Sequence, residues 1–315
     1  MVSLTDALPR RAPAPRKPAP AGSARRQVAA HQAFLVPVAI VFVVLFLVPL
    51  AQTAYYSLTD FSGYSRKVDF VGLENYRRIF SDESMLAGLL FTLAYAVGTT
   101  LAVTVLAVPL AVVLNRRFFG RNFVRSVFFF PAVPSIAVLG LVWGYILSPL
   151  GSGVLNSVLE ALFAVGPVPW LADSSLAQLS VIAVGVWSAT GWHAVLYLAY
   201  LQSIPADYYE VATIDGASPR QQFWYITLPL LTPAIVISQF LLMTGGLKVY
   251  DLPFTLTGGG PGYATYTITQ SIIVNGVGQG RYGQASALAV LFTIGVAVLA
   301  VAQLRLSRTL QRRVA

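Results

Sequence analysis

The sequence predicts an all-α membrane protein with six transmembrane helices and one short cytoplasmic helix between the fourth and the fifth. Of the 315 residues, 56% are hydrophobic and 10% are charged, and the mean hydropathy is +0.69. Soluble domains have about 45–50% apolar and about 25% charged residues. Six uncharged stretches contain apolar runs long enough to cross a bilayer, and most basic residues fall on one side of them. These observations together indicate a multi-pass protein.

The gaps between charged residues locate the expected spans, because a helix that crosses a bilayer needs about 20 mostly apolar residues. Six gaps contain such runs, at Ala33 to Leu58, Leu86 to Leu114, Val127 to Leu147, Gln178 to Leu201, Leu230 to Leu247 and Gly283 to Leu304. A seventh gap, residues 252–280, contains seven Gly, two Pro and five Thr. This composition favours a loop with a short interfacial or re-entrant helix near Ala264 to Gly276. Turn residues also flank a short apolar helix expected at Val154 to Val165.

The basic residues predict the orientation of these spans. Six spans put both termini on one side, and 15 of the 21 Lys and Arg residues then share that side. They lie in the two tails, in residues 116–125 and at Arg220, whereas the other side has six. The positive-inside rule therefore places both termini in the cytoplasm. A seventh span would move one basic tail outside, so the charge distribution argues against it.

The first 30 residues differ from the rest of the chain. They are rich in Pro, Ala and Arg, which is typical of disordered segments. We expect a disordered basic cytoplasmic tail at residues 1–30 and a six-helix membrane domain at residues 31–310. The first apolar run begins too late and is too long for a signal peptide, so we expect it to be retained.

The composition also excludes several classes of function. The chain has no Cys and two His, which leaves little chemistry for a metal site, and we expect neither a metal nor a cofactor. Basic residues clustered in tails and flanking segments argue against a nucleic-acid partner and for contact with membrane lipid. No P-loop motif is present, so the chain has no such site for ATP. We expect a protein that is not an enzyme.

The most informative segment is the loop from Ile204 to Pro233, between the fourth and fifth spans. Pro205 breaks the preceding span, and Asp207 has the chemistry to cap a new helix and to favour its positive end. Gly216 permits a turn out of that helix. We therefore expect a short amphipathic helix at the membrane surface. Its apolar and small residues are Tyr208, Val211, Ala212 and Ala217.

The spacing in this loop resembles a known motif. Glu210-Val211-Ala212, then Gly216, then Ile226-Thr227-Leu228-Pro229 is similar to the EAA loop of permease subunits of binding-protein-dependent ABC importers. In that family the loop forms a coupling helix that docks on the ATP-binding subunit. The middle Ala of the motif is Val211 here, which adds two methyl groups to the docking face. The resemblance implies ATPase-coupling roles for Asp207, Glu210, Val211, Ala212, Asp215, Gly216 and Ala217.

Three further stretches resemble the carbohydrate-uptake, maltose-type branch of these permeases: Phe70 to Tyr76, Leu198 to Pro205 and Leu256 to Pro261. The branch implies a bacterial inner-membrane subunit that forms half of a sugar pathway. Its partners would be a second homologous permease, two ATP-binding subunits that hydrolyse ATP, and an extracytoplasmic sugar-binding protein. Importers of glycerol-phosphate share these signatures, so that solute class stays open.

Two other classes of function stay open. A gradient-driven secondary carrier also fits six helices, but such carriers hold ionisable residues at mid-membrane, and here His193 is the clearest one. A membrane scaffold without transport activity would account for the spans and would leave the loop motif unexplained.

Candidate solute contacts lie on the fourth and fifth spans. Sugar sites stack rings on aromatic side chains and satisfy hydroxyls with polar groups, which draws attention to Trp187, Trp192 and His193. Gly191, one turn from Trp187, would open space beside that ring. Adjacent helical residues point about 100° apart, so we expect at most one of Trp192 and His193 to face a narrow pathway. Both tryptophans also fit helix packing.

Three polar residues of the fifth span complete the candidates. Lys248 and Asp251 are three positions apart, which favours an ion pair on one helical face, with a pathway-lining role as the alternative. Gln239 lies in mid-span and needs a partner inside the membrane, either another helix or the solute.

Overall fold

A computed structural model describes residues 35–65, 67–150 and 153–314, with side chains to residue 305. The expected tail at residues 1–30 lies outside this range. The described residues are helical apart from turns and one isolated β-bridge between Thr59 and Phe70. The chain divides into two units, Met1–Gln52 and Thr53–Ala315.

The first unit contributes most of one apolar helix. This helix runs over Leu35–Tyr56, has a mean hydropathy of 2.6 and is long enough to span a membrane. It includes a wider π-helical turn, η1 (Val43–Leu47), followed by α2 (Val48–Tyr56). The expected first span, Ala33 to Leu58, agrees with it over the described residues.

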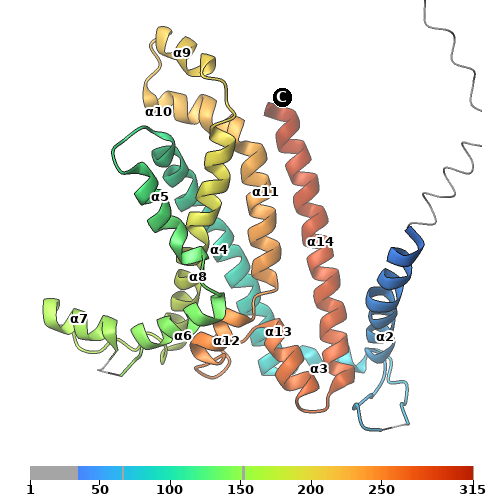
Figure 1. The fold of residues 1–315 in the computed structure, drawn as a ribbon. Coiled ribbons are helices and arrows are strands. Elements are labelled where there is room, and N and C mark those ends of the chain that lie inside the picture. Colours follow the sequence, from blue (N-terminus) through green and yellow to red (C-terminus); the bar gives the residue numbers. More distant parts are fainter. Residues whose placement is uncertain (1–34, 66, 151–152, 315) are drawn as a thin grey trace, which may run out of the picture. The chain divides into compact units, whose positions relative to one another are not determined.

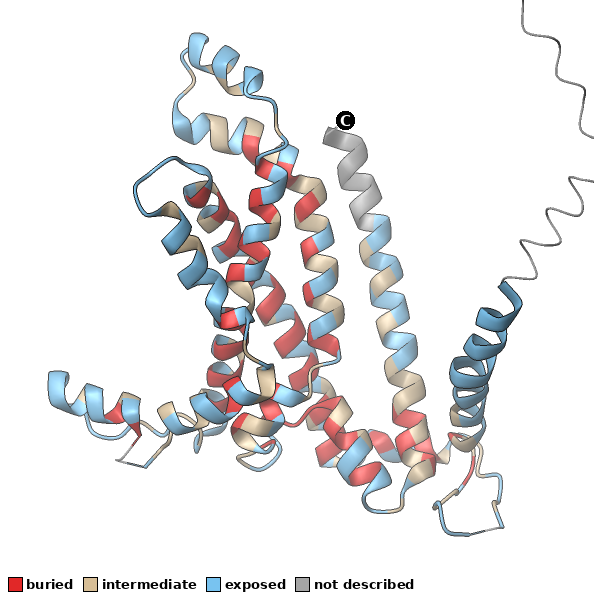
Figure 2. Cartoon of the chain, in the orientation of Figure 1, coloured by how far each residue is buried: buried red, intermediate tan, exposed pale blue. Residues whose placement is uncertain are grey.

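Three long helices form the core of the second unit, α4 (Glu83–Asn115), α8 (Ser174–Leu201) and α11 (Leu228–Leu247). Their shared cluster contains many small side chains, including Ala107, Ala111, Ala194 and Ala234, each fully buried. Small residues let membrane helices approach closely, which is how such helices associate without a hydrophobic driving force. Figure 2 shows that the buried residues concentrate on these three helices, while α14 (Tyr282–Val314) is buried mainly near its start.

The third expected span, Val127 to Leu147, is wrong as a straight helix. The segment forms α5 (Arg121–Phe129) and the short 3₁₀ turn η2 (Phe130–Ala132), and then α6 (Ile136–Ile146) after a bend of 93°. Pro131 and Pro134 explain the break, since proline lacks the N–H of a helical hydrogen bond and restricts the residue before it. The described chain thus has five apolar helices long enough to span, or six when the bent pair counts as one.

The connecting helices gather at the two ends of the bundle of the second unit (Figure 1). One end, called the α9 end, carries α9 (Asp207–Ile214), α10 (Pro219–Gln222) and the π-helical turn η3 (Phe223–Thr227). The opposite end, the α3 end, carries the remaining short helices: α3 (Glu74–Ile79), α7 (Val154–Phe163), α12 (Asp251–Thr257), α13 (Ile268–Gln270) and η4 (Ser271–Val277). In the stretch 252–280, α13 and η4 agree with the short helix expected near Ala264 to Gly276, whereas α12 was not expected.

Candidate functional site

The helix α9 projects from the α9 end and buries none of its residues. Its apolar side chains face solvent in the isolated chain: Tyr208 is 53%, Val211 58% and Ile214 85% exposed. Large apolar side chains gathered on an exposed helix mark a contact surface for another molecule. Helix α9 therefore has the surface of a docking element.

Both ends of α9 follow from its sequence, with one correction. The N-cap position belongs to Ala206, and Asp207 is the first helical residue, so the expected side-chain cap by Asp207 is wrong. Asp207 and Glu210 instead place two carboxylates in the first turn, where the helix dipole favours negative charge. Asp215 caps the other end, and Gly216 has φ +79, a left-handed conformation that glycine adopts without strain.

A second set of hydrogen bonds connects α9 to the helix that follows. Ser218 and Gln221 form a reciprocal capping box at the start of α10, a pattern readable as S-x-x-Q but not among our expectations. The Gln222 amide donates to Thr213 Oγ1 at 3.1 Å, and the hydroxyls of Tyr209 and Thr227 lie 3.1 Å apart. Hydrogen bonds thus hold α9 against α10 and η3, so we call this loop braced.

A cavity of about 400 Å³ opens at the break of the third span. Its walls are the prolines of the break and one face of α8 with Ser188, Trp192 and His193. Trp192 is 40% exposed, whereas His193 is buried and its Nδ1 lies 2.7 Å from the Ser238 hydroxyl of α11. Both residues border this cavity. The expectation that at most one of them faces a narrow pathway stays a prediction. The bend of the third span places Pro131 and Pro134 against α8, where they form the other wall of the cavity.

Trp187 lies in a different place. It borders an apolar cavity of about 410 Å³ with Trp143 and Trp170, and its ring meets that of Trp143 edge-on at 5.3 Å. Gly191 does not open space beside Trp187; a Cβ there would collide with the Phe128 carbonyl oxygen. Gly191 therefore permits the close contact of α8 with α5.

The polar candidates of the fifth span separate in the structure. Lys248 caps the end of α11 and Asp251 begins α12, and no ion pair joins them, so the expected pair on one helical face is wrong. Gln239 is half-buried on α11, and its side chain has no hydrogen bond to any described residue. A polar side chain in mid-span needs a partner inside the membrane, so the choice between another helix and the solute stays open.

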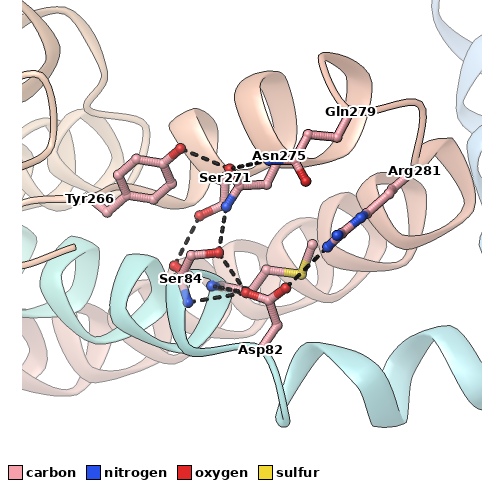
Figure 3. Close-up of polar contacts among 8 residues, drawn as sticks. Asp82, Ser84, Tyr266, Ser271, Asn275, Gln279 and Arg281 are labelled. Carbon is pink, nitrogen blue, oxygen red and sulfur yellow. Dashed lines mark hydrogen bonds and ion pairs between the residues drawn. The ribbon is translucent and has the colours of Figure 1, made fainter. Parts of the chain in front are cut away.

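A buried polar network at the α3 end was not among our expectations (Figure 3). Asp82 caps α4 by accepting from Ser84 N at 3.1 Å, and its other oxygen lies 3.5 Å from Arg281 Nη1. Asn275 donates to Ser84 Oγ and accepts from the Tyr266 hydroxyl at 3.0 Å. Burial raises the pKa of Tyr266 above its usual range, which keeps the hydroxyl protonated as a donor. The network connects η4 to the start of α4.

These features define a class of protein, a multi-helix membrane protein that presents a short exposed helix at one end of its bundle. Residues 103–315 match the family model described as the binding-protein-dependent transport system inner membrane component. The chain belongs to this family, the permease subunits of ABC transporters, and is a multi-pass inner-membrane protein.

Individual relatives agree with this assignment. The chain is 30% identical over 275 residues to the probable starch degradation products transport system permease protein AmyD of Thermoanaerobacterium thermosulfurigenes, with 87% of this chain and 92% of AmyD covered. It is 31% identical over 275 residues to the sn-glycerol-3-phosphate transport system permease protein UgpA of Agrobacterium fabrum, with 85% and 91% covered. The fold is similar to a chain of the bacterial alginate ABC transporter in complex with its alginate pentasaccharide-bound periplasmic protein. That similarity has a TM-score of 0.80, 23% identity and coverage of 92% and 98%.

Proposed function

We propose that this chain is a permease subunit of an ATP-driven importer for an oligosaccharide or glycoside, with α9 as its coupling helix. The observation that carries the proposal is the exposed, braced α9, which stands at the end of the bundle with Glu210 and Gly216 at the motif positions. An ATP-binding subunit would grip its carboxylates and apolar side chains. The same proposal places the α9 end in the cytoplasm and makes the bent pair the third of six spans.

The cavity at the break is the proposed sugar contact. Trp192 offers an aromatic face, and Ser188 and His193 supply hydroxyl and imidazole groups for sugar hydroxyls. Gln239 would contribute from α11, toward the solute or the second permease. Trp187 would act in packing, and Lys248 and Asp251 would lie toward the outer mouth of the pathway.

The lining of this cavity favours a sugar over glycerol-phosphate. No Lys or Arg borders the cavity, whereas a bound phosphate is ordinarily held by charge-assisted hydrogen bonds from such side chains. The absence of carboxylates along its walls also disfavours a gradient-driven carrier, which needs ionisable groups at mid-membrane.

The expected partners are a second permease, two ATP-binding subunits and an extracytoplasmic sugar-binding protein. Purification of the intact complex through this full-length chain, followed by ATP-dependent uptake of maltotriose in proteoliposomes, tests this assembly. Glu210→Lys should abolish uptake, because it reverses a charge on the docking face. Glu160→Lys, an equal charge reversal on exposed α7 at the other end, is the matched control and should leave uptake intact. Uptake that survives Glu210→Lys unchanged would remove the coupling role.

A further inference from the structure

A third cavity lies at the α9 end, between the end of α4 and the segment formed by α9 and α10. Its volume is about 680 Å³, within the range of about 300–1,000 Å³ common for small-molecule sites. The end of α4 contributes one wall with Pro109, Val113 and Arg116. Residues 207–222, from α9 through α10 and called the coupling segment here, contribute the other with Tyr209 and Arg220. The cavity is separate from the one that holds Trp192.

The charges at this cavity are of one sign. Arg116 and Arg220 both border it, and no Asp or Glu does. In the described part of the chain, neither guanidinium forms an ion pair or a side-chain hydrogen bond. Two arginines without a carboxylate suit a phosphate group, which guanidinium binds through paired hydrogen bonds.

The lining is amphipathic in a way that suits a lipid. Next to the two arginines lie apolar side chains, and Val113 is 52% exposed. Positions 113, 109 and 106 share one face of α4 because they are spaced four and three residues apart. Leu106 on that face is also 52% exposed, so an apolar track leads from the cavity along the membrane-spanning part of α4. A soluble phosphate would leave this track unused.

We propose that this cavity binds the headgroup of an anionic phospholipid of the cytoplasmic leaflet, with an acyl chain along Pro109, Val113 and Leu106 of α4. The proposal rests on the cytoplasmic orientation of the α9 end given under the proposed function. Basic pockets between helices on that side of a membrane are suited to anionic lipid headgroups. Such a lipid would link Arg116 on α4 to Arg220 in the coupling segment, so the coupling segment would be held in place by lipid as well as by its own hydrogen bonds.

The experiment uses the importer complex purified through the full-length chain and a phosphatidylglycerol that carries a diazirine on one acyl chain. After photolysis, mass spectrometry should find label in the peptides that contain residues 105–116. Excess phosphatidylglycerol should compete, and phosphatidylcholine should compete about thirtyfold less well, as expected for two basic residues at the surface of an anionic membrane. The double variant Arg116→Gln/Arg220→Gln should lose most of this label.

Two matched variants separate the site from general effects of charge or folding. Arg117→Gln/Arg121→Gln removes two nearby arginines that border a different cavity and should keep the label. Arg116→Lys/Arg220→Lys keeps the charge and should retain the label to within about threefold. Equal competition by phosphatidylcholine, undiminished label in the glutamine variant, or displacement by millimolar glycerol 1-phosphate as readily as by the lipid would each overturn the proposal. A complex that takes up maltotriose but carries no label at residues 105–116 would overturn the lipid site and leave the proposed function intact. Conversely, if Glu210→Lys leaves uptake unchanged, the coupling role fails, and we still expect the label.

Discussion

The turn that ends α9 offers a sharp test of the coupling role. Gly216 has φ +79, and a Cβ built there would meet no atom within 4 Å. Gly216→Ala therefore introduces backbone strain without a steric clash. The left-handed conformation costs an L-residue about 1–2 kcal/mol, which lowers the ratio of the native turn to alternative conformations by about 5- to 30-fold relative to wild type.

The assay is ATP hydrolysis by the reconstituted complex, stimulated by the sugar-loaded binding protein. We expect Gly216→Ala to lower stimulation toward that range while the complex still assembles, because the strain is confined to an exposed loop. Gly216→Asn should have a smaller effect, since asparagine tolerates this conformation better than alanine. Gly295→Ala adds the same methyl group to open space within helix α14, without a positive φ, and should be neutral. Normal stimulation in Gly216→Ala, or an equal loss in Gly295→Ala, would refute the reasoning.

Three further predictions concern the sugar cavity, the orientation and the α3 end. Trp192→Ala should lower uptake by up to about tenfold with assembly intact. Trp187→Ala should instead lower the free energy of unfolding by about 2 kcal/mol, because its ring is 42% exposed and loses only part of its packing. Reversed phenotypes in uptake and melting assays would contradict both roles. Reporter fusions after Arg312 and Tyr263 should report cytoplasm and exterior respectively. A cytoplasmic signal at Tyr263 would contradict the six-span topology with cytoplasmic termini. Asn75→Leu should lower stability by about 2–4 kcal/mol, since the buried Asn75 amide donates to the carbonyls of Ser57 at 2.9 Å and Thr59 at 2.7 Å; an unchanged melting temperature would show that these bonds contribute little.

Spans and short helices were predictable where the signal is local. A mostly apolar, uncharged run of about 20 residues favours a membrane span, and this rule located α4, α8, α11 and α14 to within a few residues at most ends. The glycine at position 216 likewise predicted its own turn, because a left-handed residue is a property of the local backbone.

Long-range geometry was not predictable from the same residues. Pro131 and Pro134 stand in the sequence, but prolines are tolerated inside membrane helices, as Pro109 in α4 and Pro233 in α11 show. Nothing local distinguishes a proline that is accommodated from one that breaks a span by 93°. The cavity that Trp192 and His193 share depends on that break, so helical spacing alone did not predict the cavity.

The hydrogen bond between His193 and Ser238 has a consequence for coupling. Helix α8 leads into the coupling loop and α11 leads out of it, and this bond joins the two helices at 2.7 Å beside the proposed sugar cavity. The hydroxyls of Tyr209 and Thr227 make a second link within the loop, between α9 and η3. The first bond joins α8 to α11, and the second joins α9 to the turn that leads into α11. If α9 is the coupling helix, we expect α8 and α11 to move together when it is displaced. The opposite wall of the cavity, at Pro131 and Pro134, belongs to a separate bent segment. Under the proposed coupling role, a displacement of α9 would change the distance across the cavity more than the distance from His193 on α8 to Ser238 on α11. His193 would then keep its hydrogen-bond partner while Trp192 moves relative to the wall that it faces.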